Sequence, residues 1–246
     1  MNDYTADSET MTGKIEAEKG GQGFDARGFP DVIAAHEAGH VVALAAAGLA
    51  DEFTRATIVP QNGVHGLTIR SGASLFKLSG ELTGHSQRIA GATGADQQAA
   101  VKAFGDFILT TPAVCLPHIC FFFGGGACDR MLGRESAARN SIDVNCVNTM
   151  VLPAMVLPPL ADGDLRLVQS KIDAVLFQVF ERERALLVKV YNALVERKTI
   201  DRASIGREIM DDMRACAKRA SSDYSELLKW FEAWHAGRAP KFAQMG

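Results

Sequence analysis

The sequence predicts a mainly helical domain with a small β-hairpin or short sheet after the first helix. Apolar residues recur every three or four positions over 31–47 and 165–194, as one buried helix face requires. Two short β-prone runs, 53–59 and 64–70, flank a turn that contains an Asn-Gly pair. Hydrophobic residues make up 47% of the 246 residues and aromatic residues only 7%, so the core must consist mainly of Ala, Val, Leu and Ile.

The first 28 residues differ from the rest of the chain. They are polar, rich in glycine and without periodicity, which predicts a disordered tail. They also lack the basic and apolar regions of a secretory signal, which favours a cytoplasmic protein. We therefore expect one folded domain over residues 29–246.

The first predicted helix covers residues 31–47. Asp31 follows a proline and can cap the free backbone N–H groups of the first turn. Ala and Val dominate the segment, which predicts that most of the helix is buried. Gly48 is a natural stop at the C-terminal end.

The middle of the chain is less regular than the first helix. Residues 71–85 are rich in Gly and Ser and remain ambiguous, whereas the Ala and Gln runs of 86–109 predict a helix. The apolar segment 113–132 contains a triple glycine and is expected to be a buried helix that breaks near those glycines. A further helix is expected over 140–157, ending before two prolines.

The last third of the chain is amphipathic. The apolar stripe of 165–194 predicts one long helix, or two with a kink, with charged residues on the other face. Shorter helices are expected at about 202–219 and 223–236. The last of these carries a cluster of large aromatic side chains, which we interpret as a packing face, with a partner-binding helix as the alternative: Trp230, Phe231 and Trp234.

Bulk charge and apolar content exclude some classes of function. A net charge of −3 and a pI of about 6.1 disfavour a dedicated nucleic-acid binder. The most apolar stretch, 107–123, contains two prolines and a histidine, so we expect no membrane span. The five cysteines form no CxxC pair and are expected to be free thiols in a reducing cytosol: Cys115, Cys120, Cys128, Cys146 and Cys216.

The segment His36-Glu37-Ala38-Gly39-His40 carries the strongest chemical signal. Histidines four residues apart lie on one face of a helix, where their imidazoles can share one Zn²⁺. Glu37 is rotated by about 100° from His36 and can take a proton from a water molecule at the open side of the metal. The surrounding helix is apolar, so these polar groups would be costly to bury without such a partner. The alternative is an ordinary polar helix face.

A catalytic zinc usually needs a third protein ligand. A third His in a short extension after the motif is absent, because no His occurs from residue 41 to 48. Spacing does not select among the acidic candidates or among the remaining histidines near the motif. These are Glu52, Glu81, Asp96, Asp106, Asp129, Glu135 and Asp143, with His65, His85 and His118.

Several segments, in the same order, resemble the peptidase domain of the FtsH-type membrane AAA proteases. The resemblance extends over roughly residues 30–210. The matching segments are a zinc-binding helix, a strand segment, a glycine-rich helix, an Asp-containing stretch and a turn between the final helices: Ala35–Val42, Thr57–Pro60 with Gly66–Thr68, Gly124–Asp129, Ser136–Asp143 and Leu194–Asp201.

The resemblance implies a helical zinc-metallopeptidase domain. It implies that His36, His40 and Asp143 bind Zn²⁺ and that Glu37 is the general base. Asp129 then either orients a zinc-bound histidine or caps a helix. The segment 57–59 either pairs with an extended peptide substrate or is plain hairpin structure, which we favour slightly.

The chain also departs from that family. The Gly-x-x-x-x-Gly-Lys-Ser/Thr motif of an ATPase does not occur, nor do the family's N-terminal membrane spans. The family has Arg and Glu where this chain has Gly126 and Asp129. Residues 71–123 and 211–246 match poorly. ATP-driven unfolding therefore cannot be inferred, and a homo-oligomer remains only one candidate assembly.

Three functional hypotheses follow. The first is an ATP-independent, stand-alone zinc metallopeptidase that cleaves unfolded polypeptides or peptides. The second is a non-catalytic, peptidase-like adaptor that binds a partner protein or a separate ATPase. An intact His-Glu-x-x-His motif argues against the adaptor, because a binding module has no need of Glu37. A metal-dependent hydrolase of non-peptide amides is the third.

Overall fold

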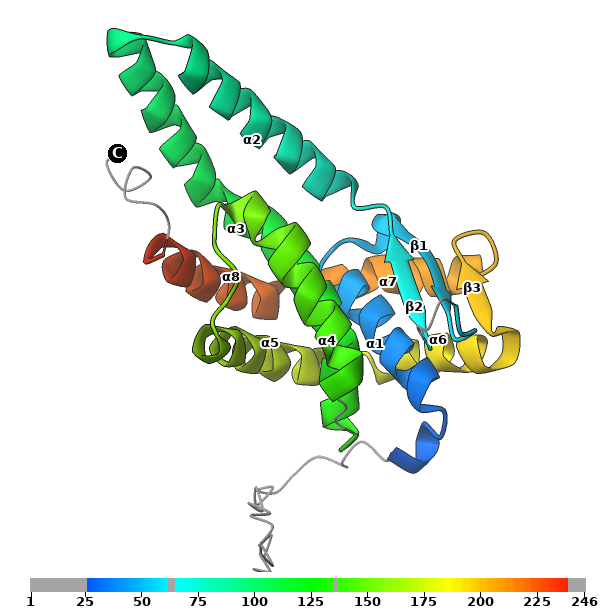
Figure 1. Cartoon of the computed structure of the whole chain (residues 1–246). Coiled ribbons are helices and arrows are strands. Elements are labelled where there is room, and N and C mark those ends of the chain that lie inside the picture. Colours follow the sequence, from blue (N-terminus) through cyan, green and yellow to red (C-terminus); the bar gives the residue numbers. More distant parts are fainter. Residues whose placement is uncertain (1–25, 62–64, 135–136, 239–246) are drawn as a thin grey trace, which may run out of the picture.

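The computed structural model describes residues 26–61, 65–134 and 137–238 (Figure 1). These residues form eight α-helices and one three-stranded sheet, which confirms the mainly helical class with a small sheet. Of the predicted N-terminal tail, only residues 26–28 are described, and they form a 3-10 turn. The remainder of that prediction lies outside the described residues.

Helix α1 (Val32–Ala46) is the central element of the core. The Asp31 carboxylate accepts hydrogen bonds from the backbone N–H groups of Ile33 and Ala34, at 3.1 and 3.0 Å, and so caps the first turn. All residues from Ala34 to Ala46 are buried. Gly48 follows with a φ of +80°, a left-handed conformation that ends the helix. The prediction of a buried helix over 31–47 is confirmed.

The sheet lies beside α1 and has the order β2-β1-β3. Strand β1 (Phe53–Thr57) pairs antiparallel with β2 (Leu67–Arg70) and with β3 (Thr199–Asp201). The predicted pairing of two strands is confirmed, while the Asn-Gly turn falls at Asn62-Gly63, outside the described residues. β3 was not predicted, because a strand of three residues is too short to show a period of two.

The central position of β1 supports the favoured hairpin alternative for Thr57, the one residue of segment 57–59 that lies in the strand. Both edges of β1 are paired within the sheet, so its strand residues cannot also pair with an extended peptide. β2 and β3 are the two outer strands, and each pairs only with β1 among the described residues. The strand edges available to a peptide therefore belong to β2 and β3.

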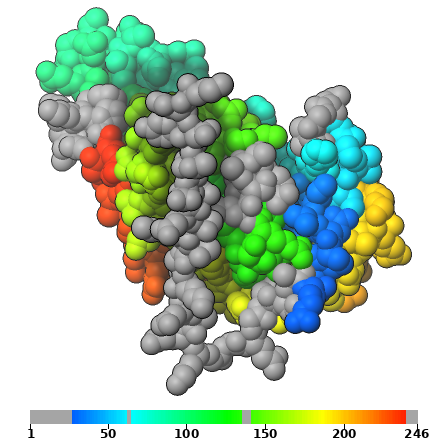
Figure 2. Space-filling view, turned by 60° about the horizontal axis from the view of Figure 1, so that its bottom comes forward, coloured from blue at the N-terminus to red at the C-terminus, as the bar shows by residue number. Residues whose placement is uncertain are grey.

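Helices α2 (Ala73–Gly91) and α3 (Gly94–Met131) form a long hairpin. α2 and the first half of α3 extend away from the body, and this lobe stands out in both views (Figures 1 and 2). The ambiguous segment 71–85 is thus mainly helical, and the helix expected over 86–109 is divided by the turn between α2 and α3. One part of α3, by length and composition, could cross a membrane, and 61% of that stretch is buried inside the chain.

The predicted break near the triple glycine is wrong. α3 runs without interruption through Gly124–Gly126, and also through Pro112 and Pro117. The glycines lie where α1 crosses α3, and α1 packs against α3 more than against any other element. Packing against α1 therefore stabilises the helical conformation of these residues, although glycine has a low helix propensity.

The remaining elements cover α1 and the second half of α3. Helix α4 (Ala137–Cys146) continues as a π-helical turn (Val147–Val151) and a 3-10 turn (Pro153–Met155), where one helix was expected over 140–157. The stripe of 165–194 forms two helices that meet at Glu183, so the kinked alternative is confirmed. The last two helices lie close to their predicted ranges. The four helices are α5 (Asp162–Arg182), α6 (Arg184–Arg197), α7 (Arg207–Arg219) and α8 (Ser221–Ala236).

Two smaller expectations about the core are confirmed. Phe231 and Trp234 are buried and stacked, with ring centroids 5.3 Å apart, while Trp230 is half-buried against them. The aromatic cluster of α8 is thus a packing face. All five cysteines are free, and four of them are buried.

Candidate metal centre

His36 and His40 lie on one face of α1, and their Nε2 atoms are 3.1 Å apart. α4 brings Asp143 to the same point, with its Oδ2 atom 3.6 Å from Nε2 of His36 and 3.5 Å from Nε2 of His40. Three side chains from two elements thus converge. In the part of the chain that the structure describes, they form the one group of three or more such side chains with a spacing suited to a metal ion.

The second nitrogen of each imidazole is held by a buried acceptor on α3. Nδ1 of His36 lies 2.8 Å from Oδ2 of Asp129, and Nδ1 of His40 lies 2.8 Å from the carbonyl oxygen of Phe121. Because a carbonyl only accepts, the proton of neutral His40 belongs on Nδ1; the N–H of Gly125 makes a longer contact of 3.3 Å to the same atom. Both Nε2 atoms then turn unprotonated lone pairs toward Asp143.

These positions fit a tetrahedral zinc site. Ligand atoms at about 2.0–2.2 Å from one zinc ion are separated from one another by roughly 3.4 Å. The three observed separations, 3.1, 3.5 and 3.6 Å, lie around that value. Three acceptors gathered in a buried place repel one another unless a cation or protons lie between them. The donor set and its spacing therefore fit Zn²⁺.

The pKa shifts within the cluster also show that it favours positive charge. Burial alone would lower the pKa of His36, but hydrogen bonds to Asp129 and Asp143 outweigh it and raise that pKa to about 9. Burial alone would raise the pKa of Asp143, but the two histidines lower it to about 2. Without a metal ion, the cluster thus takes up protons that a metal must displace.

Glu37 lies beside this group and is 4% exposed. Its Oε2 atom accepts a 2.6 Å hydrogen bond from the hydroxyl of Thr68 on β2, which orients the carboxylate. Burial raises the pKa of Glu37 above its usual value, although the two histidines and Thr68 act in the opposite direction. A carboxylate with a raised pKa is a better proton acceptor at neutral pH than a solvated one.

Glycines on α3 and α1 make room for the imidazoles. A Cβ atom at Gly125 would lie 2.5 Å from Nε2 of His40 and 2.6 Å from Nε2 of His36. Gly39 and Gly124 form a second close contact between the two helices. A Cβ atom at Gly39 would lie 2.7 Å from the carbonyl oxygen of Gly124, and a Cβ atom at Gly124 would lie 2.8 Å from the carbonyl oxygen of Gly39. Real Cβ atoms do not approach that closely, so only glycine permits this crossing of α1 and α3.

The group opens into a cleft of about 380 Å³. His36, Glu37, His40 and Asp143 line it together with residues 65–68, the last two of which begin β2. The volume is in the range of small-molecule and peptide-side-chain sites. The three candidate ligands, Glu37 and the start of β2 therefore face one cavity.

None of the other described candidate ligands belongs to the group of three. Glu52 accepts hydrogen bonds from Ser74, and His118 contacts the same serine. His85 stacks on Phe107 in the hairpin, and His65 lines the cleft but is exposed. Glu135 lies outside the described residues. The three other acidic candidates that do not reach the cluster are exposed on the hairpin: Glu81, Asp96 and Asp106.

Sequence reasoning missed several supporting residues. Thr68, which holds Glu37, carries no local signal because the contact joins β2 to α1 only in the folded chain. The carbonyl of Phe121 is a backbone group and is invisible to any motif. Gly125 could have been found, since a triple glycine within an apolar helix can mark a close approach of backbones as well as a break.

Comparison with models of known protein families, with characterised proteins and with solved structures gave no significant match.

Proposed function

We propose that this chain is a zinc-dependent peptidase of the FtsH type that acts independently of ATP. The observation that carries the proposal is the meeting of His36, His40 and Asp143 at zinc-ligand spacing, with the buried carboxylate of Glu37 at the side of the same cleft. An adaptor would need neither three side chains at zinc-ligand spacing nor an oriented carboxylate beside them.

His36, His40 and Asp143 would hold the ion. When bound, zinc would supply a Lewis acid that polarises a carbonyl group and acidifies water. Asp129 and the carbonyl of Phe121 keep the Nδ1 protons in place, so that both imidazoles offer Nε2 in a fixed orientation. Asp143 balances part of the positive charge.

Glu37 would move the protons. Its carboxylate takes a proton from the attacking water and then passes that proton to the amine that leaves. The hydroxyl of Thr68 donates to Oε2 of the carboxylate, which leaves Oε1 to act on water. Burial of Glu37 supports this role, because it raises the affinity of the carboxylate for a proton.

The cleft supports an extended polypeptide as substrate. The outer edge of β2 lies at the cleft and has no strand partner among the described residues, so a peptide can add to it through main-chain hydrogen bonds. A folded protein would not offer such a segment, which is why we propose unfolded chains or peptides as substrates. We also propose a cytoplasmic location, with a separate ATPase as a candidate partner that supplies unfolded chains.

Metal content and turnover of an unfolded protein test the proposal together. The purified chain should contain stoichiometric zinc by elemental analysis and should degrade an unfolded, labelled casein-like substrate. Chelation by EDTA should abolish turnover, and added zinc should restore it. Glu37→Gln should keep the metal but lose roughly 10²–10⁴-fold in kcat, whereas Asp143→Ala should lose the metal itself.

The contrary outcomes are distinct. Full turnover by Glu37→Gln would eliminate the proposed base. A chain that holds zinc but cleaves no unfolded protein would be a peptidase-like adaptor, and cleavage of simple amides without cleavage of peptides would indicate a non-peptide amide hydrolase. Stoichiometric zinc in Asp143→Ala would remove Asp143 from the ligand set.

A further inference from the structure

A second cavity of about 430 Å³ adjoins the metal cleft. The two share three lining residues, Thr68, Phe121 and Phe122. Apart from these, the second cavity has mainly apolar walls, contributed by the start of α2 and by Met150. A group that fills it would therefore lie immediately beside whatever occupies the metal cleft.

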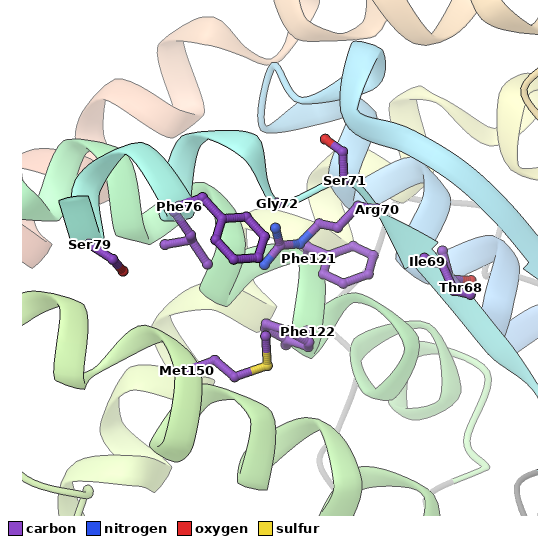
Figure 3. A pocket seen from close by; sticks show the side chains of 11 residues that line it. Thr68, Ile69, Arg70, Ser71, Gly72, Phe76, Ser79, Phe121, Phe122 and Met150 are labelled. Carbon is purple, nitrogen blue, oxygen red and sulfur yellow. The ribbon is translucent and has the colours of Figure 1, made fainter.

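Arg70, the last residue of β2, reaches into this apolar cavity. Figure 3 shows its guanidinium extending toward Phe76 and lying against Phe121. The carbon of the guanidinium is 5.2 Å from the centroid of the Phe121 ring and 5.3 Å from that of Phe122. The side chain is only 6% exposed. A buried cation among apolar walls is costly unless it has a counter-ion.

The charge of Arg70 is incompletely matched within the described residues. Its one carboxylate neighbour there is Glu52, with Nη1 and Oε2 3.5 Å apart, beyond an ideal charge-assisted hydrogen bond. The other oxygen of Glu52 is taken by the backbone N–H and hydroxyl of Ser74. Nε of Arg70 is buried and has no hydrogen-bond partner in the described part of the chain. Nε of the guanidinium is therefore a donor that a bound anion can satisfy.

We propose that this cavity is a substrate subsite that binds a carboxylate, with Arg70 as the binding residue. The inference rests on the proposed peptidase function, and it adds the class of substrate. The carboxylate can come from an acidic side chain close to the cleaved bond or from the free C-terminus of a short peptide. Both present the planar, two-oxygen group that a guanidinium binds through paired hydrogen bonds.

The shared lining residues connect this subsite to the reacting groups. Thr68 lines both cavities, and its hydroxyl holds Glu37. The carbonyl of Phe121 accepts from His40, while its ring lies under Arg70 and 5.4 Å from the His40 ring. A carboxylate bound to Arg70 therefore belongs to a residue near the bond that is cleaved.

Binding to the zinc-loaded Glu37→Gln protein tests the subsite without turnover. Labelled peptides would carry Glu or Gln in turn at each position around the expected cleavage site, with either a free or an amidated C-terminus, and their Kd values would be measured by fluorescence anisotropy. We expect one placement of a carboxylate to bind about tenfold or more tightly than its neutral counterpart. The Glu-against-Gln series and the acid-against-amide series separate the two sources.

Variants then assign that preference to Arg70. In the Glu37→Gln background, Glu52→Gln should increase the preference, because Arg70 loses its competing carboxylate while Ser74 keeps an acceptor. Glu52→Gln with Arg70→Gln should abolish the preference without leaving Glu52 as an unpaired buried charge. Arg88→Gln, an exposed arginine of α2, is the matched control and should change nothing. Thermal unfolding and zinc content of every variant show whether the fold is kept.

Two results would overturn the subsite: equal Kd values for all charged and neutral peptide pairs, or a carboxylate preference that persists when Arg70 is replaced. Failure of the peptidase proposal looks different, since it is the absence of cleavage by the protein with Glu37 intact. The binding measurement decides about Arg70 in either case. Where cleavage occurs, kcat/KM should follow the same order of peptides.

Discussion

The two halves of α3 differ in burial and in what they contact. The second half crosses α1, is almost entirely buried and holds both histidines of the candidate metal centre through Asp129 and the carbonyl of Phe121. The first half stands out from the body beside α2, with most of its residues exposed. Glycine occurs both at the crossing of α1 and α3 and in the projecting hairpin of α2 and α3, but its structural role differs between the two places.

The difference lies in what surrounds each glycine. At Gly39, Gly124 and Gly125, a Cβ atom would collide with backbone or with imidazole, so the absence of a side chain is what lets α1 and α3 meet. At Gly80 of α2, a Cβ atom would meet nothing within 4 Å. Glycine is therefore required by packing at the crossing, while in the projecting hairpin it only weakens the helix.

The largest effect should come from adding one methyl group at the crossing. Gly125→Ala would place a Cβ atom against Nε2 of both histidines and should lower zinc affinity by about 100-fold or more, because the ligand atoms themselves must move. Zinc content after dialysis against a graded chelator measures this, with circular dichroism as the test of folding. Stoichiometric, tightly held zinc in a folded Gly125→Ala protein would contradict the close approach.

The pH dependence of the free energy of unfolding should also distinguish the buried half of α3, because His118 lies there. This residue of the buried half is fully buried, contacts Ser74 through Nε2 at 2.8 Å, and has no partner for Nδ1 among the described residues. Burial, with the charge of Arg70, lowers the pKa of His118 from 6.5 to about 4. The unfolded chain then binds the additional proton, so stability falls as pH drops from about 6.5 to about 4 and levels off below.

The measurement compares two proteins. A shift of this size is worth up to about 3 kcal/mol between pH 7.5 and pH 4. His118→Gln keeps a donor for Ser74 but cannot titrate, so urea unfolding of this variant should lack that part of the acid-dependent loss. His85→Gln on α2, in the projecting hairpin, is the control, and it should stay much closer to the unaltered protein because His85 is less buried. Identical pH profiles for the His118 variant and the unaltered chain would show that His118 does not titrate in this way.

Replacement of an aspartate in each half sharpens the comparison further. Asp129→Asn should weaken zinc binding by about 10–100-fold, because the amide no longer provides the negative partner that fixes the Nδ1 proton of His36. Asp106→Asn changes the same residue type on the exposed half and should leave zinc affinity unchanged. Competition with a fluorescent zinc chelator measures both. Equal affinities in the two variants would mean that Asp129 has no part in the metal site.

The contrast between local sequence signals and tertiary packing explains which features the sequence could predict. α1 and the β1–β2 pair were predictable because their periodicity and caps are local, and His36, Glu37 and His40 lie on one such element. Asp143 was selected only through a family resemblance, since its proximity depends on how α4 packs. The continuity of α3 was mispredicted because propensity treats every glycine alike, whereas packing against α1 distinguishes them.

The smallest predicted effect has the opposite sign from the others. Gly80→Ala in α2 should stabilise the protein by about 0.5–1 kcal/mol, because alanine loses less conformational freedom in a helix and finds open space at this position. Gly39→Ala adds the same methyl group at the crossing and should instead destabilise it by about 1–3 kcal/mol through overpacking. Urea unfolding monitored by circular dichroism gives both values under one condition. If both variants were more stable than the unaltered protein, helix propensity alone would govern these glycines, and the close approach of α1 and α3 would not be needed to explain the chain.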